Sequence, residues 1–154
     1  VGTGTTVRVA LPAAPKALEA PAPPEAPRVQ PAARRGRVLF VDDERAIGIA
    51  MRRALASEHD VTYVQSGRAA LELLRDGAPF DVIISDVMMP EMDGMELYEE
   101  LAREWPGREK ELIFMTGGAF SPKATEFLQR VPNVQLAKPF DPKVLGALVR
   151  ERLR

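Results

Sequence analysis

Three aspartates at the ends of two short apolar runs are the residues of this sequence best suited to hold a cation. Asp42 and Asp43 follow the run Val38-Leu-Phe-Val, and Asp86 ends the run Asp81-Val-Ile-Ile-Ser-Asp. Such runs are typical of buried parallel strands, whose C-terminal ends carry the sites of open α/β sheets. Crowded carboxylates repel one another, whereas Mg²⁺ prefers oxygen ligands and supplies compensating charge. If the two strands are neighbours, a magnesium site is expected; otherwise these are solvated loop acids.

A hydroxyl and an ammonium follow two later apolar runs and are expected at the same edge of the sheet. Thr116 and Lys138 each come directly after such a run, and Gly117-Gly118 leave the approach open. A cation, an ammonium and a hydroxyl together neutralise and hydrogen-bond a phosphoryl group. Asp86 then becomes a candidate nucleophile, because carboxylates accept phosphoryl groups as acyl phosphates. Taken singly, Thr116 is equally a strand-end residue and Lys138 a surface charge.

The elements that must position these side chains alternate regularly along the chain. Apolar periodicity switches between short runs and helical spacing, which is typical of repeated β-α units around a parallel sheet. The predicted strands are residues 38–41, 61–64, 80–85, 111–115 and 134–137. The predicted helices follow Asp43, begin at Ser66, carry Leu97 to Trp105, and begin at Ser121-Pro122 and Asp141-Pro142. Five strands and five helices in strict alternation are therefore expected.

The first 36 residues differ in composition from the rest. Residues 1–11 contain a strand-like alternation of Val7, Val9 and Leu11, and residues 12–36 are rich in alanine and proline. Proline favours extended chain, so the second segment is predicted to be a semi-rigid linker. The sequence opens on Val1, which suggests a piece of a longer protein. We therefore expect one folded domain over residues 37–154.

Composition excludes several classes of function. The 154 residues include 45% hydrophobic and 28% charged residues, the balance of a globular domain with a tail. A net charge of −1 gives no electrostatic basis for binding nucleic acid or an anionic membrane surface. The absence of cysteine excludes disulfides, and the single His59 excludes a histidine-based metal cluster. We expect no nucleic-acid partner and no direct membrane contact by this fragment.

Four motifs in order along the chain resemble those of the bacterial response-regulator receiver domain. They are Asp42-Asp43, Asp86-Val-Met-Met-Pro-Glu-Met-Asp-Gly94, Thr116-Gly117 and Lys138-Pro139-Phe140. The resemblance covers residues 37–154. It implies an α/β, flavodoxin-like, doubly wound five-stranded parallel sheet of order 2-1-3-4-5, flanked by five helices.

The resemblance also implies a ligand set for Mg²⁺. Asp86 is then the phosphorylated residue. Asp43 and Asp86 bind the ion through carboxylates, Met88 through its backbone carbonyl and Asp42 through water. No other cofactor is implied.

Further residues correspond to the family's catalytic and switch positions. Lys138 and Thr116 are expected to contact the phosphoryl group, and the Lys138-Pro139 bond is expected to be cis. Gln135 stands where the family often has an aromatic side chain that moves on phosphorylation. We therefore expect a small response around Gln135 and a larger one in residues 117–121, with Phe120 changing its burial.

The implied function is that of a phosphoacceptor in a two-component phosphorelay. The domain takes a phosphoryl group from phosphohistidine onto Asp86, then relays or hydrolyses it, in the cytoplasm. Residues 1–11 resemble the end of a histidine-kinase ATPase domain, so the parent chain is expected to be a hybrid sensor histidine kinase. The expected partner is that kinase core or a histidine phosphotransfer domain. Whether the fragment counts as an enzyme is open, since it catalyses only its own phosphorylation and dephosphorylation.

Two other functions are alternatives to this one. A receiver can act mainly as a regulatory binding module on its attached kinase. A phosphatase of the aspartyl-phosphate type also uses Asp, Mg²⁺, Thr and Lys, but begins with an Asp-x-Asp-x-Thr pattern that Asp86-Val-Met-Met-Pro does not match.

Overall fold

A computed structural model describes Gly2, residues 35–118 and residues 121–154. The chain divides into two units, Val1–Ala32 and Ala33–Arg154, and all the elements given below belong to the second. The strand-like pattern expected in residues 1–11, the linker before residue 35, and Phe120 lie outside the described residues.

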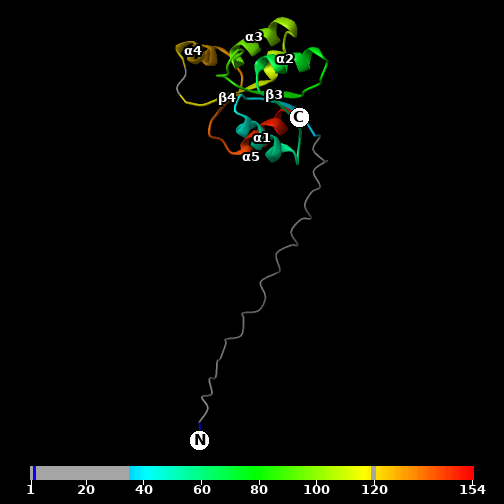
Figure 1. Ribbon diagram of the computed structural model, residues 1–154, viewed down its shortest axis with the longest axis vertical. Helices are drawn as coiled ribbons and strands as arrows, with labels where there is room; N and C mark the ends of the chain where they lie inside the picture. The colour runs from blue at the N-terminus through cyan, green and yellow to red at the C-terminus, as the bar shows by residue number, and fades with distance from the viewer. Residues whose placement is uncertain (1, 3–34, 119–120) are drawn as a thin grey trace, which may run out of the picture. The chain divides into compact units, whose positions relative to one another are not determined.

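Helices cover both faces of one parallel sheet in the described part of the chain (Figure 1). The strands are β1 (Arg37–Val41), β2 (Asp60–Val64), β3 (Val82–Asp86), β4 (Leu112–Thr116) and β5 (Gln135–Ala137). The helices are α1 (Arg45–Leu55), α2 (Gly67–Arg75), α3 (Gly94–Glu104), α4 (Pro122–Arg130) and α5 (Pro142–Arg152), with a 3₁₀ helix, η1, at Arg108–Glu111. Helices α1 and α5 lie on one face, and α2, α3 and α4 lie on the other.

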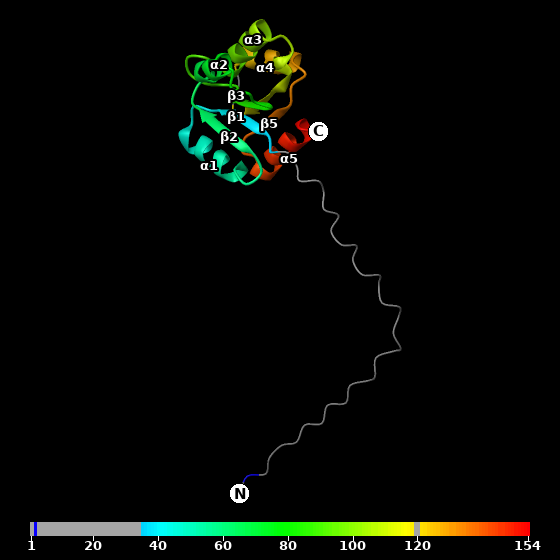
Figure 2. The same ribbon diagram turned by 90° about the vertical axis from the view of Figure 1, so that its right-hand side faces the viewer.

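The strand order is β2-β1-β3-β4-β5, and every neighbouring pair is parallel. Figure 2 shows the sheet from the side, between the two helical layers. The chain runs from β1 outward to β2 and then returns past β1 to β3, so the connections diverge between β1 and β3. This is the switch point at which doubly wound sheets place their sites. The predicted fold class and strand order are confirmed.

Alternation along the central strands builds two cores, one on each face of the sheet. Leu39 and Val41 of β1 face one core, whereas Val38 and Phe40 face the other. All four side chains are fully buried, as a central parallel strand covered on both faces requires. The other central strands β3 and β4 divide in the same way.

Helix starts follow the capping residues that the sequence indicated. The Ser66 side chain accepts a hydrogen bond from the Ala69 N–H, and the Ser121 side chain accepts one from the Ala124 N–H. Asp141 caps α5, with proline at the first helical position. Within residues 35–118 and 121–154, no helix combines the length and the apolar character needed to cross a bilayer.

The strand bounds differ from the sequence prediction by one or two residues, and one short helix was not predicted. Strand β3 begins at Val82 rather than at residue 80, although the Asp81 N–H already donates to the Arg37 carbonyl at 2.8 Å. The polar segment Arg108–Glu111 forms η1, and this helix was not predicted because its sequence has no apolar periodicity. Asn133 holds this helix in place by donating to the carbonyls of Glu109 and Leu112, each at 2.8 Å.

Candidate functional site

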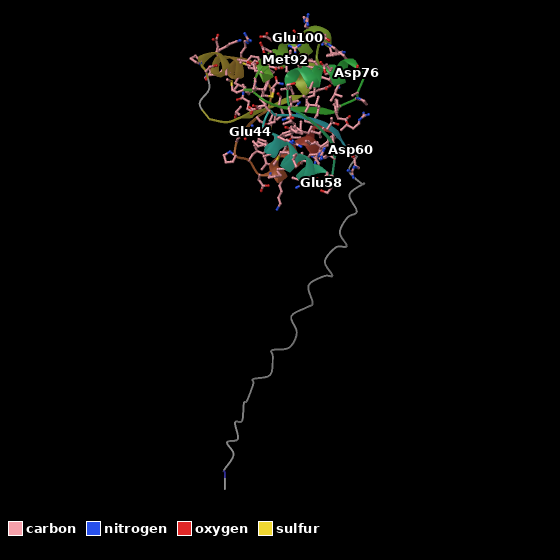
Figure 3. The ribbon with its side chains drawn as sticks, viewed as in Figure 1. Glu44, Glu58, Asp60, Asp76, Met92 and Glu100 are labelled. Carbon is pink, nitrogen blue, oxygen red and sulfur yellow. The ribbon has the colours of Figure 1, made fainter. Side chains whose placement is uncertain are left out.

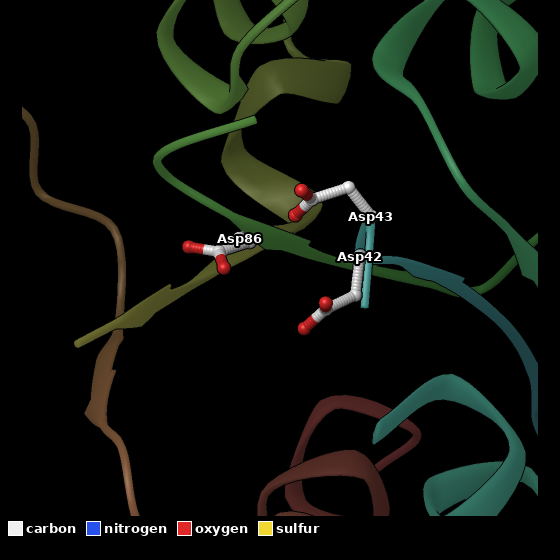
Figure 4. Close-up of side chains that lie close together, drawn as sticks. All are labelled: Asp42, Asp43 and Asp86. Atoms are coloured by element: carbon white, nitrogen blue, oxygen red, sulfur yellow. The ribbon is translucent and has the colours of Figure 1, made fainter. Parts of the chain in front are cut away.

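Three carboxylates meet at the C-terminal edge of the sheet, where β1 and β3 lie side by side. Asp42 and Asp43 follow the last residue of β1, and Asp86 is the last residue of β3. One carboxylate oxygen from each lies within 4.8 Å of the others. Figure 4 shows the three groups turned toward a common space. The convergence expected from the two apolar runs is therefore present.

Lys138 is the cation that joins this cluster from β5's side of the sheet. Its Nζ donates to Asp42 Oδ2 at 2.8 Å and to Asp86 Oδ2 at 2.6 Å. The ammonium comes just after β5, and its own backbone N–H donates to the Thr116 carbonyl at 2.6 Å. Two of the three carboxylates, those of Asp42 and Asp86, thus share one ammonium, and the cluster keeps an excess of negative charge.

Asp42 is the buried member of the cluster. Its side chain is fully shielded from solvent, and its Oδ1 accepts a hydrogen bond of 2.8 Å from the Glu44 N–H. Burial raises the pKa of Asp42 above its ordinary value, and the hydrogen bond from Lys138 opposes this shift without cancelling it. Burial also lowers the pKa of Lys138, but its bonds to Asp42 and Asp86 outweigh burial and hold that pKa above its ordinary value. The ammonium therefore keeps its proton.

Asp86 and Asp43 are more open than Asp42. The Asp86 side chain is 13% exposed, and its Oδ1 accepts a hydrogen bond of 3.2 Å from the Met88 N–H. Asp43 is exposed to solvent. The Met88 side chain extends outward and is 45% exposed. An incoming group therefore reaches the cluster on the side of Asp43 and Asp86.

Thr116 ends β4 beside Asp86. In the β3–β4 ladder Asp86 is paired with Met115, so Thr116 lies one residue further along the same edge. Its hydroxyl donates to the Leu136 carbonyl of β5 over 3.4 Å, a long and therefore weak hydrogen bond. The hydroxyl can exchange this bond for a better acceptor at low cost.

Tyr63 and Gly48, which the sequence did not single out, also shape the site, as does Gly94 at the end of the Asp86 motif. The Tyr63 hydroxyl donates to the Asp42 carbonyl at 3.0 Å, and its ring occupies the space that a Cβ on Gly48 would need. A Cβ on Gly94 would lie 2.4 Å from the Asp86 carbonyl oxygen. Gly48 could have been noticed in the sequence as a glycine inside an amphipathic helix. Its contact with Tyr63 is known only from the fold.

A pocket adjoins the carboxylates between α1 and the segment after β5. Its volume is about 400 Å³, and its lining is mostly apolar. The lining residues are Glu44, Ile47, Met51, Gly117, Gly118, Lys138, Pro139 and Phe140. The Lys138-Pro139 peptide bond is cis, as expected.

Gln135 lies away from the carboxylates. It is the first residue of β5, and its side-chain Nε2 donates to the Leu128 carbonyl of α4 at 2.7 Å. Of the residues predicted for the site, Asp42, Asp43, Asp86, Thr116 and Lys138 come together, Met88 borders them, and Gln135 does not join them.

The sequence of this chain is similar to a known protein family and to several of its members. The response regulator receiver domain family matches residues 38–150. Sensor kinase CckA of Brucella abortus (strain 2308) is 35% identical over 161 residues, which cover 99% of this chain and 17% of the relative. Response regulator MprA of Mycolicibacterium vanbaalenii is 34% identical over 119 residues, which cover 77% of this chain and 50% of the relative. The chain thus spans half or less of these relatives.

A solved structure of a receiver domain is similar to this chain in fold and in sequence. The signal receiver domain of a signal transduction histidine kinase from Syntrophus aciditrophicus has a TM-score of 0.67 and 28% sequence identity. The match covers 77% of this chain and 89% of that domain. Fold, acidic edge and sequence agree, and the chain belongs to the response regulator receiver domain family of two-component signalling.

Proposed function

We propose that Asp86 accepts a phosphoryl group from a phosphohistidine in a Mg²⁺-dependent reaction and then relays or hydrolyses it. The observation that carries the proposal is the imbalance of charge at the sheet edge. Asp42, Asp43 and Asp86 converge there, and the Lys138 ammonium pairs with two of them, Asp42 and Asp86. A dianionic phosphoryl group can approach such a cluster only if further positive charge is present.

The transfer is a displacement at phosphorus. An oxygen of Asp86 forms a bond to phosphorus while the P–N bond of the phosphohistidine breaks. The bonding electrons stay on the imidazole nitrogen, which takes up a proton from water. In hydrolysis, water attacks the phosphorus of the acyl phosphate, the P–O bond to Asp86 breaks, and inorganic phosphate leaves.

The donor set fits Mg²⁺, which binds oxygen ligands and keeps several waters. Asp43 and Asp86 present carboxylates that solvent reaches, whereas the side chain of Asp42 is fully buried. This supports direct ligation by Asp43 and Asp86, with Asp42 acting through water. The backbone carbonyl of Met88 is proposed as a further ligand. When bound, the ion would neutralise charge on the phosphoryl oxygens.

Lys138 and Thr116 are proposed to hold the phosphoryl oxygens. Lys138 already touches Asp86 Oδ2, so its ammonium lies next to the atom that reacts. The hydroxyl of Thr116 is held only by the weak bond to Leu136 and is free to turn toward the new group. Both side chains would stabilise charge that develops during the transfer.

The pocket beside the carboxylates is proposed to receive the donor protein. Ile47, Met51 and Phe140 offer apolar area next to Lys138, enough for side chains around a phosphohistidine to pack against. The donor is a histidine kinase core or a histidine phosphotransfer domain. Because such a donor obtains its phosphate from ATP, we place the reaction in the cytoplasm.

The parent protein is proposed to be a hybrid sensor histidine kinase. The similarity to Sensor kinase CckA extends over 99% of this chain, including the part before the receiver domain. In this proposal residues 1–11 are the end of the kinase's ATPase domain, residues 12–36 are the linker, and residues 37–154 are the receiver domain.

Intact mass spectrometry after incubation with acetyl phosphate and Mg²⁺ tests the function. We expect the mass of one phosphoryl group on the wild-type chain, none on Asp86→Asn, and slower labelling of Asp42→Asn. Excess EDTA should abolish labelling, because the carboxylates then repel the donor.

The matched control is Asp60→Asn. Asp60 is the first residue of β2, at the edge of the sheet opposite the site, so this variant should label normally. Full labelling of Asp86→Asn, or labelling that ignores EDTA, would contradict the proposal.

A further inference from the structure

The last turn of α4 carries a carbonyl that the helix cannot satisfy. Four residues after Leu128 stands Pro132, which has no N–H to donate. The proline also favours extended backbone before it, and Val131 is extended with φ −88° and ψ 139°. The helix therefore ends at Arg130. The Leu128 carbonyl receives its hydrogen bond from Gln135 instead, across the gap between α4 and β5.

This partly buried bond connects the last turn of α4 to the edge strand of the sheet. Leu128 is 7% exposed and belongs to the core on that face of the sheet. At 2.7 Å the bond is short for an amide donor. A carbonyl left unpaired near the core costs more than a hydrogen bond contributes. Gln135 thus fixes the C-terminal end of α4 to β5.

The N-terminal end of α4 is held differently. Ser121 caps it locally, by accepting from the Ala124 N–H at 3.2 Å. The helix follows Gly117 and Gly118, and Gly118 has a φ of +74°, a conformation that glycine adopts without strain. Backbone movement is therefore easier at this end than at the end tied by Gln135.

We infer that Gln135 is a positioning residue that holds the C-terminal end of α4 to β5 in both the free and the phosphorylated protein. The inference rests on the proposed phosphorylation of Asp86. When the Thr116 hydroxyl turns to the phosphoryl group, it releases the Leu136 carbonyl and the end of β4 shifts. That shift passes through Gly117 and Gly118 to the start of α4. The end of α4 cannot follow without breaking the hydrogen bond between Gln135 and the Leu128 carbonyl.

Hydrogen exchange in the free protein tests the bond itself. Gln135→Glu keeps the size of the side chain and removes the N–H donor. We expect exchange of the amides of residues 128–131 to accelerate about tenfold, the equivalent of one lost hydrogen bond. Gln129→Glu makes the same chemical change on the exposed side of the same turn and is the control for charge near the helix end. Equal exchange in the two variants would overturn the inference.

Backbone and side-chain amide shifts with a beryllofluoride mimic of the phosphoryl group test the response. In the wild-type and Gln129→Glu proteins, residues 121–125 should shift, while residues 128–131 and the Gln135 side-chain amide should not. In Gln135→Glu the last turn should shift as well, a change that a purely structural role would not produce. Wild-type shifts of equal size at both ends of α4 would sink the inference.

The two proposals fail in different ways. If the Thr116 and Lys138 signals do not respond to beryllofluoride, phosphorylation at Asp86 is wrong. The exchange measurement on the free protein still decides whether Gln135 holds α4.

Discussion

Asp42 shows how function and stability oppose each other in a single side chain. Burial raises its pKa, so the ionised form is less favourable in the folded than in the unfolded chain. Its contribution to the free energy of unfolding therefore grows as the pH falls through the folded pKa, and is smallest at neutral pH. A buried acid of this kind is typical of sites shaped by chemistry rather than by stability. Lys138 partly offsets the cost of burying the Asp42 carboxylate, because its ammonium forms ion pairs with Asp42 and Asp86.

Glu91 adopts a left-handed backbone conformation that is unfavourable for glutamate. Its φ is +66°, and the Met92 N–H donates back to the Pro90 carbonyl at 2.8 Å, so the chain turns tightly at this residue. Side chains other than glycine, asparagine and aspartate are strained there. We expect Glu91→Asn to raise the free energy of unfolding by about 1 kcal/mol, as measured by urea denaturation.

Glu91→Gln is the matched control. It removes the same charge but has no greater preference for positive φ than glutamate. Its stability should equal that of the wild type. An equal gain in both variants would show that charge, and not backbone conformation, limits stability at this turn.

His59 is expected to make the domain sensitive to mild acid. Its side chain is almost fully buried, and its Nδ1 accepts a hydrogen bond of 3.3 Å from the Gly36 N–H. Burial lowers the pKa of His59 below its ordinary value of 6.5; Arg150 acts in the same direction, and Glu58 opposes it. The unfolded chain therefore binds the proton first, and stability is lost as the pH falls from 6.5 through the folded pKa.

Urea midpoints at pH 7.5 and 5.5 measure this loss. The wild type should be less stable at the lower pH, and His59→Gln, which still offers an acceptor to Gly36, should show a smaller difference. The neighbours Glu58 and Asp60, labelled in Figure 3, are present in both proteins and cancel in the comparison. The same pH dependence in both would assign the effect to other groups.

At the scale of the elements, the sequence predicted what periodicity encodes. The central strands are fully buried runs and the helices are amphipathic, so their order and type were predictable. The 3₁₀ helix was missed because its four polar residues have no period, and Asn133 fixes it from a distant part of the chain. The contact of Tyr63 with Gly48 was not predicted, because it depends on how β2 and α1 pack in the folded protein.

Gly94 is expected to be essential to the joint between β3 and α3. Its Cβ would lie 2.4 Å from the backbone oxygen of Asp86, and backbone cannot yield as a flexible side chain can. We expect Gly94→Ala to lower the free energy of unfolding by about 2–3 kcal/mol, as measured by urea denaturation. Phosphorylation of Asp86 should slow as its strand end is displaced.

Gly146→Ala tests whether that effect comes from the overlap or from the substitution. The new Cβ in α5 would meet Arg150 and Leu55 at 3.5 Å, an ordinary contact. Alanine favours a helix interior over glycine, so this variant should gain about 0.5–1 kcal/mol. A loss in both variants would contradict the steric explanation.

At the scale of the whole molecule, the site follows from the topology. Parallel strands bring their C-terminal ends to one edge, so acids, a threonine and a lysine that follow separate runs could be predicted to meet. Their detailed pairing could not. Which carboxylates Lys138 binds, and that Asp42 is fully buried, depend on how α1 and the cis Lys138-Pro139 segment pack. The bond from Gln135 to α4 likewise depends on tertiary structure.

The boundary of the stable unit is expected between residues 33 and 36. Residues 12–31 offer little apolar area beyond Leu18 and Val29, so their removal should change stability little. Arg35 and Gly36 differ, because they bond to the turn between α1 and β2. Arg35 donates to the Ala56 carbonyl at 2.8 Å, and Gly36 donates to His59.

Two truncations that differ by three residues therefore define this boundary. Deleting residues 1–33 should move the thermal midpoint by no more than a few degrees, whereas deleting residues 1–36 removes these hydrogen bonds and should lower it by several degrees more. The deletion of residues 1–36 also leaves His59 without its backbone donor, so the loss of stability between pH 7.5 and 5.5 should shrink. Midpoints from differential scanning calorimetry at both pH values decide the question. If both truncations melt together at each pH, Arg35 and Gly36 do not anchor the domain.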